Sequence, residues 1–434
     1  MLESGFPAST PIPGGWRRNV AVFLSSQALS LFGSALVQYA LMWHITLTTK
    51  SGTMMALMII LGFLPAFFLS PFAGVFADRH DRKRIIMLAD AGIALATLVL
   101  ALVYAGGTEA VGLLLVVSAL RSVGQAFHIP AVGALLPQMV PPESLMRVNA
   151  VNGSVQSGLS FAAPVVAGAL LSLAPFQVIL FVDVATASLA VGLLALFLRV
   201  PPHAKASHPQ ATGYFEDLRL GFRYVRDHRY LVGFFVYMAL LFFLIAPAAF
   251  LTPLQTARTY GPEVWRLTAL EIAFSAGMTV GGAVLAAIIG FRNRMTTVVL
   301  STLVMALCTA ALGLAPPFWA YLGFMVLFGL AIPYFNAPLT TLLQEHVEPD
   351  YLGRVYSINS MISSSMMPFG MLAFGPLGDL VRIELLLVGT GIAIAALGIG
   401  VRMSRTLMEM GEPALASKTA TQAAAEAASD PAGA

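Results

Sequence analysis

Residues 74–84 read GVFADRHDRKR, from Gly74 to Arg84, a densely charged stretch between two long apolar segments. Two acids, Asp78 and Asp81, and four permanent bases stand between positions 78 and 84. The segments on either side carry almost no charge. Such a stretch indicates a water-exposed turn that joins two membrane-crossing helices.

The composition excludes an ordinary soluble enzyme. Of the 434 residues, 58% are hydrophobic and only 10% are charged, whereas a soluble domain averages roughly 25% charged residues. The mean hydropathy of +0.82 implies more apolar surface than a compact core can hide, so a lipid bilayer must cover the rest. The single cysteine, Cys308, excludes a disulfide framework.

Apolar runs long enough to cross a bilayer recur along nearly the whole chain. Backbone groups in lipid must be satisfied within the segment, so we expect an all-α membrane protein. The first run is too long to be a cleavable signal. The expected spans are 20–46, 54–77, 85–106, 110–129, 151–174, 176–198, 231–253, 267–290, 295–315, 318–342, 355–377 and 384–401.

Lysine and arginine predict the orientation of these spans. Most of the 24 basic residues fall in segments on the side that holds the N-terminus. The opposite loops carry only Lys50, Arg258, Arg266 and Arg382. This bias predicts a multi-pass protein of the cell membrane with both termini in the cytoplasm.

The longest polar interruption predicts the domain organisation. Residues 199–230 separate a six-helix bundle at 1–198 from a second at 231–403, and 404–434 is expected to be a disordered cytoplasmic tail. Within the linker, 214–229 has apolar residues at helical spacing among arginines. This pattern favours a helix on the inner membrane surface, with partner binding as the alternative.

The two halves also share a sequence pattern. Five residues after the fourth span recur in the same order after the tenth, with one single-residue gap, which argues for a duplicated six-helix unit. The pairs are Phe127/Phe335, Pro130/Pro338, Pro141/Pro349, Arg147/Arg354 and Asn152/Asn359. Duplicated halves around a midplane site are typical of secondary transporters, whereas a receptor or a simple channel subunit needs no such symmetry.

The charged stretch resembles motif A of the major facilitator superfamily. The matching positions are Gly74, Asp78, Arg79 and the basic pair Lys83-Arg84, although the family usually has glycine where this chain has Asp81. The Asp-Arg-x-Asp-Arg form is similar to the drug:proton antiporter branch typified by macrolide efflux proteins. The resemblance implies the major facilitator fold: twelve transmembrane helices in two pseudo-symmetric six-helix bundles.

This resemblance also implies a conformational latch on the cytoplasmic side. Asp78 would sit against the N-terminus of the eleventh span, where free N–H groups favour an anion by about 0.3–1 kcal/mol. The arginines would pair with nearby acids such as Asp90. The expected latch residues are Gly74, Asp78, Arg79, Lys83, Arg84 and Asp90. The alternative is a solvated basic cluster that only sets topology.

Two predicted helices carry a polar stripe. Side chains at i, i+3 and i+7 share one helical face; the first stripe is Gln27, Ser30, Ser34 and Gln38, and the second is Ser118, Arg121, Gln125 and His128. The family resemblance implies that spans one, four, seven and ten line a central cavity. The alternative is hydrogen bonding between helices, worth only about 0.6 kcal/mol per contact.

Three charged residues inside spans are candidate coupling residues. A buried guanidinium is costly, so Arg121 requires a reason, and it matches the motif B arginine that the family implicates in coupling. A structural ion pair is the alternative. A carboxyl group in an apolar site keeps a proton more readily than in water, so Asp183 or Glu271 would carry the coupled proton, or else pair locally. His128 is expected to be a packing residue.

Small residues and aromatics complete the pattern. Residues 163–168 (APVVAG) resemble the antiporter motif C, and Gly277, Gly281 and Gly282 form a face for close helix contact. Aromatic residues in spans seven and ten would line a cavity for hydrophobic or weakly cationic molecules, unless they face lipid. They are Phe234, Phe235, Tyr237, Phe242, Phe243, Tyr334 and Phe335.

No phosphate-binding Gly-x-x-x-x-Gly-Lys-Ser/Thr loop or metal-ligand cluster occurs in the sequence, so we expect no cofactor, no metal and no catalytic residue. The expected partners are a small-molecule substrate, protons and the bilayer, with no nucleic acid and a monomeric state. The predicted function is proton-coupled drug export by alternating access. An uptake carrier, a siderophore exporter, a channel and a membrane enzyme are the alternatives.

Overall fold

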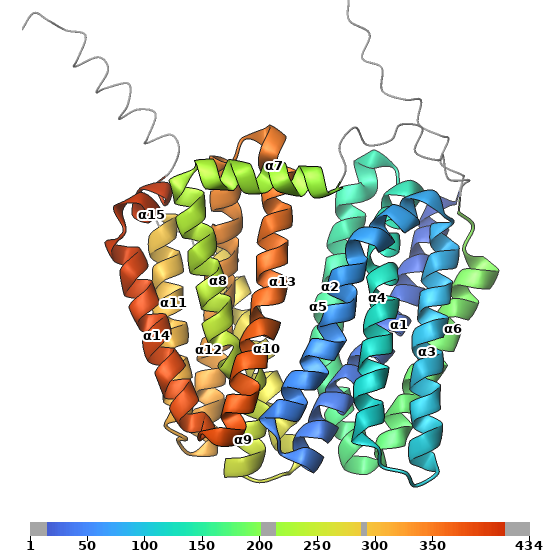
Figure 1. Ribbon diagram of the computed structural model, residues 1–434. Coiled ribbons are helices and arrows are strands. Elements are labelled where there is room, and N and C mark those ends of the chain that lie inside the picture. Colours follow the sequence, from blue (N-terminus) through green and yellow to red (C-terminus); the bar gives the residue numbers. More distant parts are fainter. Residues whose placement is uncertain (1–14, 201–213, 288–292, 413–434) are drawn as a thin grey trace, which may run out of the picture. The chain divides into compact units, whose positions relative to one another are not determined.

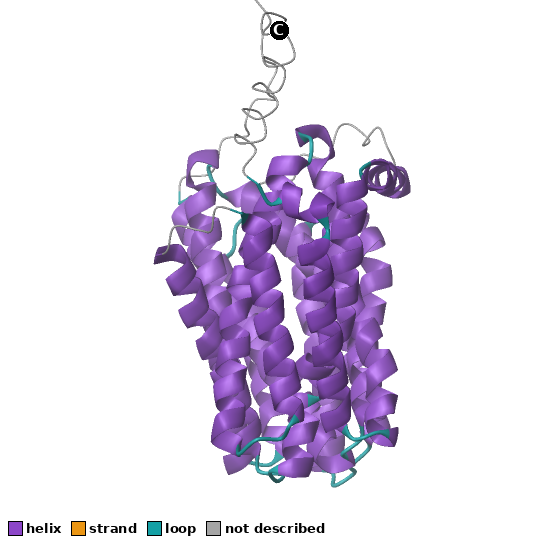
Figure 2. Ribbon diagram, turned by 90° about the vertical axis from the view of Figure 1, so that its left-hand side faces the viewer, coloured by secondary structure: helices purple, strands orange, loops and turns teal. Residues whose placement is uncertain are grey.

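The computed structural model describes residues 15–200, 214–287 and 293–412. Within these ranges the chain is helical and contains no strand (Figure 2). Twelve long helices and three short ones follow one another in the described ranges. They are α1 (Trp16–Thr49), α2 (Gly52–Arg79), α3 (Arg82–Ala105), α4 (Val111–Met139), α5 (Pro142–Leu173), α6 (Phe176–Phe197), α7 (Tyr214–Asp227), α8 (Arg229–Phe250), α9 (Thr252–Thr259), α10 (Val264–Ala287), α11 (Arg294–Gly313), α12 (Phe318–His346), α13 (Pro349–Leu380), α14 (Ile383–Met403) and α15 (Arg405–Met410).

Eleven stretches of the described helices are long and apolar enough to cross a membrane. The predicted span 355–377 corresponds to α13, which has 32 residues but is not among the eleven. Its composition explains the difference, because α13 carries a run of serines at 363–365 and charged residues in its first turns. The predicted all-α membrane fold is confirmed.

The helices form two compact units. The first unit comprises Met1–Thr49, Leu57–Ala211 and Glu263–Thr268. In it, α1 packs against α5 and α6, and α3 packs against α4 and α6. A hydrophobic core lies where the charged stretch joins α2 to α3, and it includes Phe23, Ala77, Ile86 and Leu135. The charged residues therefore stand on a tightly packed apolar base.

The second unit comprises Lys50–Ala56, Thr212–Pro262 and Ala269–Ala434. Here α8 packs against α13 and α14, and α11 packs against α12 and α14. Helix α7 lies across the ends of α8 and α13 (Figure 1). It is held there by an ion pair between Asp217 and Arg354 at 2.9 Å and by stacking of Tyr224 on Tyr351.

The chain ends differ in part from the expected disorder. We expected the tail to begin at 404, but residues 405–410 form α15, whose Leu407 and Met410 are buried. The rest of the predicted tail from 413, and the linker residues 201–213, lie outside the described residues.

Close backbone contact joins α10 to α12, as the glycine pattern indicates. A Cβ added at Gly281 would lie 2.9 Å from the Cα of Leu330, and one added at Gly277 would collide with the backbone of Val326. Gly282 differs, because the nearest atom to its added Cβ is a Pro333 side-chain carbon at 4.0 Å. Only two of the three glycines are therefore required by the packing.

These neighbouring glycines provide a matched pair of variants. Gly281→Ala should destabilise the protein by about 1–3 kcal/mol, because the Leu330 backbone cannot move aside as a side chain would. Gly282→Ala should leave stability unchanged or raise it by about 0.5–1 kcal/mol, since alanine favours the helix. Thermal unfolding of the purified proteins in detergent measures both, and equal midpoints would contradict the packing.

Candidate functional site

A buried ion pair lies in the interior of the first unit. Arg121 on α4 donates to the Asp183 carboxylate on α6, with Nη1 2.7 Å from Oδ2. The two side chains are only 4% and 1% exposed. Two residues that the sequence singled out separately are thus each other's partners. This supports the alternative of an ion pair for Arg121, and pairing does not by itself exclude a role in coupling.

Arg121 also donates to two further groups. Its guanidinium donates to the Thr97 hydroxyl on α3 at 2.5 Å and to the backbone carbonyl of Ser34 on α1 at 3.2 Å. Gly33 permits this approach of α1, because an added Cβ would collide with Asp183 and Thr186. One cation therefore links α1, α3, α4 and α6. Thr97 was not predicted as a partner of Arg121, because no pattern in the sequence of α3 indicates that this threonine contacts a residue of α4.

A second buried carboxylate lies in the same unit. Asp90 accepts a hydrogen bond from the Ser30 hydroxyl at 2.9 Å, and Nε2 of His128 lies 3.3 Å from the same oxygen, Oδ1. Both titratable side chains are buried. We expected Asp90 beside the arginines of the charged loop and His128 in simple packing. The structure places Asp90 inside the bundle instead, because it points from α3 toward α1 and α4.

Several polar atoms of this region have no hydrogen-bond partner among the described residues. They are both side-chain polar atoms of Gln27, the Ser118 hydroxyl, one oxygen each of Asp90 and Asp183, and Nε2 of His128, whose contact with Asp90 lacks hydrogen-bond geometry. Buried polar groups are normally satisfied, and each exception requires an explanation. In the predicted stripe on α1, Gln27 and Ser30 are therefore buried, Ser34 is half-buried and Gln38 is exposed. In the stripe on α4, Gln125 is half-buried.

The charged loop is organised by a residue that was not a predicted latch residue. Arg82 donates to the carbonyl of Ala134 at 2.9 Å and to Asp78 at 3.2 Å. Lys83 donates to the carbonyl of Leu198 at 2.9 Å, and Asp81 caps α3 by accepting from the Arg84 backbone. Asp81, which replaces the usual glycine of the family motif, thus serves as the N-cap of α3. Arg79 is exposed, and a Cβ at Gly74 would meet no atom within 4 Å.

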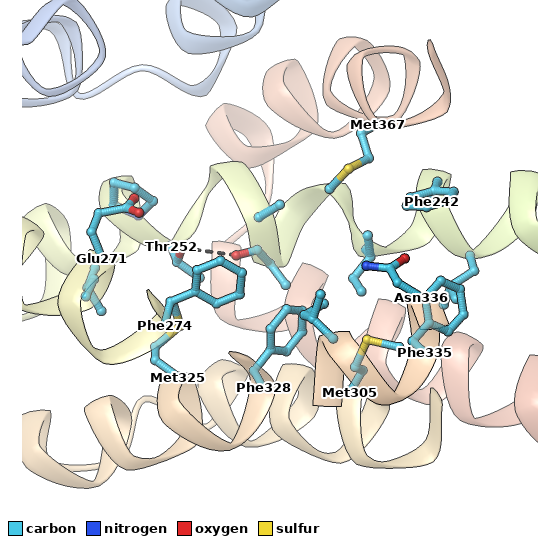
Figure 3. Close-up of a pocket in the computed structure, with 17 residues that line it drawn as sticks. Phe242, Thr252, Glu271, Phe274, Met305, Met325, Phe328, Phe335, Asn336 and Met367 are labelled. Atoms are coloured by element: carbon cyan, nitrogen blue, oxygen red, sulfur yellow. Dashed lines mark hydrogen bonds between the residues drawn. The ribbon is translucent and has the colours of Figure 1, made fainter. Parts of the chain in front are cut away.

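The second unit encloses a cavity of about 240 Å³ between α8, α10, α11, α12 and α13 (Figure 3). Its lining is mainly apolar, and the aromatic and thioether side chains in it are Phe242, Phe274, Phe328, Phe335, Met305, Met325 and Met367. Glu271 and Asn336 supply polar groups at opposite ends of the cavity (Figure 3). The predicted residues Glu271, Phe242 and Phe335 are therefore brought together. Aromatic, methionine-rich walls with one acid suit an apolar molecule with a weak positive charge.

The predicted tyrosines do not line this cavity. The Tyr237 side chain is buried and its hydroxyl lies 2.5 Å from the Thr302 hydroxyl of α11. Tyr334 is half-buried on α12 and precedes the lining residues Phe335 and Asn336. Residues one position apart on a helix point in different directions, so the run of aromatics could not identify which members line a cavity.

Another carboxylate, not singled out in the sequence, caps the first turn of α2, which belongs to the second unit. Asp379 at the end of α13 accepts from the backbone of Gly52 and Thr53 at 2.7 and 2.9 Å, and from the Ser51 and Thr53 hydroxyls, both at 2.7 Å. Arg258 also donates to it at 2.9 Å. Burial disfavours the charged carboxylate, but these hydrogen bonds outweigh it and hold the pKa of Asp379 well below its ordinary value.

Comparison with known proteins places this geometry in context. Residues 21–371 match the family model described as Major Facilitator Superfamily. Macrolide efflux protein A of Streptococcus pyogenes is 30% identical over 386 residues, which cover 88% of this chain and 95% of that protein. Macrolide efflux protein A of Enterococcus faecalis is 32% identical over 316 residues, covering 72% and 98%. The crystal structure of a mutant of the nucleoside transporter NupG is 16% identical, with a TM-score of 0.71 and coverage of 89% and 99%.

Neutral replacement of the buried ion pair tests its energetic role. Arg121→Met or Asp183→Leu alone should destabilise the protein by about 3–5 kcal/mol, because each leaves an uncompensated buried charge. The double variant should recover most of this loss. Thermal unfolding in detergent is the measurement, and a double variant no more stable than the singles would contradict the pairing.

Arg84→Met is the control for an exposed ion pair. It removes the contact of Arg84 with Asp81 and should change stability by less than about 1 kcal/mol.

Proposed function

Because the chain belongs to the Major Facilitator Superfamily, a family of membrane transporters and not of enzymes, we propose that it exports hydrophobic or weakly cationic small molecules in exchange for protons. It would act as a monomer of the cell membrane with both termini in the cytoplasm. The two relatives named as macrolide efflux proteins support the class of cargo, since the likeness extends over nearly their whole length. The six-helix halves at 1–198 and 231–403 would alternate access to the cargo.

The observation that carries this proposal is the cavity in the second unit. Its aromatic and methionine side chains offer polarizable apolar contacts that adapt to different shapes. Glu271 adds a negative charge at one end, which attracts a protonated amine. At about 240 Å³ the cavity accommodates one apolar part of a large molecule better than the whole of it. The chemistry fits a bulky amphiphile with a basic group.

The polar cluster of the first unit supports coupling to protons. Its carboxylates Asp90 and Asp183 lie in surroundings where water is scarce, and several nearby polar atoms lack partners among the described residues. Such groups in a membrane-spanning bundle mark ion or proton pathways by default. Arg121 would hold the cluster together through the Ser34 carbonyl of α1, and Gln27 of the same α1 stripe is also buried.

Export is tested in a bacterial host that lacks its own efflux pumps. Cells that produce the protein should accumulate less radiolabelled erythromycin, a weakly basic macrolide, than cells with the empty vector, and a protonophore should abolish the difference. Saturation of the flux with erythromycin distinguishes a carrier from a channel. Higher accumulation in the producing cells would indicate uptake and contradict export.

The acid in the cavity predicts selectivity for charge. Glu271→Gln should reduce export of erythromycin more than export of an uncharged hydrophobic dye, because only the protonated amine loses an electrostatic partner. Glu109→Gln, an exposed acid between α3 and α4, is the matched control and should change neither. Equal losses for both cargoes would show that Glu271 has no part in charge recognition.

The latch predicted at the charged loop forms part of the same proposal. Asp78→Asn should lower the export rate while the amount of protein in the membrane stays normal, since the exposed carboxylate contributes little to the fold. Transport in inverted membrane vesicles, normalised to protein amount, is the measurement. Unchanged transport in this variant would leave the loop with only a topological role.

A further inference from the structure

The Asp90 side chain lies in an unusual setting for a residue near the charged loop. It is 3% exposed and its Oδ1 is shared between the Ser30 hydroxyl and the His128 ring. Its second oxygen has no hydrogen-bond partner within the described residues. Three helices, α1, α3 and α4, thus contribute one polar group each to a single point. A carboxylate and an imidazole in contact titrate as a pair: they can share one proton, and the pair can take up or release a proton.

The neighbouring ion pair is less suited to proton exchange. Arg121 is a permanent cation, so a proton on Asp183 would leave a guanidinium without its counter-ion in apolar surroundings. His128 differs, because an imidazole can lose its own charge when its partner gains a proton. Of the two buried carboxylates among the described residues of this unit, Asp90 is therefore the one whose protonation leaves no buried cation without its counter-ion.

The charges around the Asp90–His128 pair do not compete for the proton. The other buried charged side chains of the described helices are Arg121 on α4 and Asp183 on α6, which pair with each other at 2.7 Å. Helix α1 contributes the Ser30 hydroxyl at this point and the nearby amide of Gln27, both uncharged. The net charge of the site is therefore set by the pair itself.

We propose that Asp90 and His128, oriented by Ser30, form the proton-binding site of this carrier. The proposal rests on the proposed function and names the residues that exchange the proton. With one proton bound the pair is neutral overall, and after release to water it carries one negative charge. Each transport cycle would bind one proton at the pair and release it on the other side of the membrane. The unpartnered atoms of Asp90 and His128 are where the proton or a water would bind.

The test uses the full-length protein reconstituted in liposomes, with radiolabelled erythromycin as the probe. Two modes are compared: uptake driven by a pH gradient, and counterflow against unlabelled erythromycin without a gradient. Asp90→Asn and His128→Gln should lose the stimulation by the gradient and retain counterflow. His44→Gln, a half-buried histidine stacked on Phe176, is the matched control and should behave as the unmodified protein.

The outcomes separate this proposal from the one on which it rests. If the unmodified protein shows counterflow without any response to the gradient, proton coupling itself is wrong and the site falls with it. If the unmodified protein responds and both variants still respond equally, the export proposal stands and the assignment to Asp90 and His128 is overturned. Loss of counterflow in a folded Asp90→Asn variant would make Asp90 a cargo contact and also overturn the assignment.

Infrared spectroscopy provides a readout that does not depend on transport. The unmodified protein in detergent should show a carboxylic-acid band that appears as the pH is lowered. This band should be absent in Asp90→Asn, moved to a different pH in His128→Gln and unchanged in His44→Gln. If Asp90→Asn does not fold, Asp90→Glu takes its place; because it keeps a carboxyl group, it should retain the band and move it to a different pH. A band identical in all variants would overturn the proposal.

Discussion

A guanidinium inside an apolar helix bundle must have a fixed counter-ion, and the pairing of Arg121 with Asp183 satisfies that constraint. The other partners of Arg121 come from α1 and α3, so one side chain determines how four helices of the first unit meet. The constraint on a single charge explains why the Thr97 hydroxyl and the Ser34 carbonyl converge on Arg121. Gln27, Ser30, Asp90 and Ser118 are also buried in this unit.

The two units differ in chemistry although their sequences share a repeat. The first buries acids, a histidine and an arginine, whereas the second encloses a mainly apolar cavity with four phenylalanine and three methionine side chains in its lining. On the proposed function, proton exchange would belong to the first unit and recognition of the apolar cargo to the second. Of the prolines shared by the two halves, Pro141 and Pro349 stand at the starts of α5 and α13, whereas Pro130 and Pro338 lie inside α4 and α12. Arg354 illustrates the divergence: it holds α7 through Asp217.

Most of the fold was predictable because the signal is local. A membrane-crossing helix requires a continuous apolar run, and among the described helices such runs occur at every predicted span except 355–377. The short helices α9 and α15 lack that signal and were missed. The helical stripe likewise predicted which residues of α4 share a face, and Arg121 and His128 are both buried.

Partners on different helices were not predictable in the same way. Helical spacing shows which side chains share a face, but not which helix that face meets. Asp183 and Asp90 were therefore identified as candidates without their partners Arg121 and His128. Asp379 had no local signal at all, since its donors are residues 51–53. The aromatic residues predicted a cavity with aromatic side chains in its lining. They did not identify which residues line it, because Phe335 lines the cavity and the adjacent Tyr334 does not.

The cap that Asp379 places on α2 has a mechanical consequence. The first turn of α2 groups with the second unit, whereas α2 from Leu57 onward groups with the first. One continuous helix therefore belongs to both units. If those units rotate against each other, the strain must be released either by detachment of Ser51, Gly52 and Thr53 from the carboxylate or by bending of α2. Pro65 and Pro71 lie inside the helix and weaken its backbone hydrogen bonding, so α2 contains its own hinge beside its anchor.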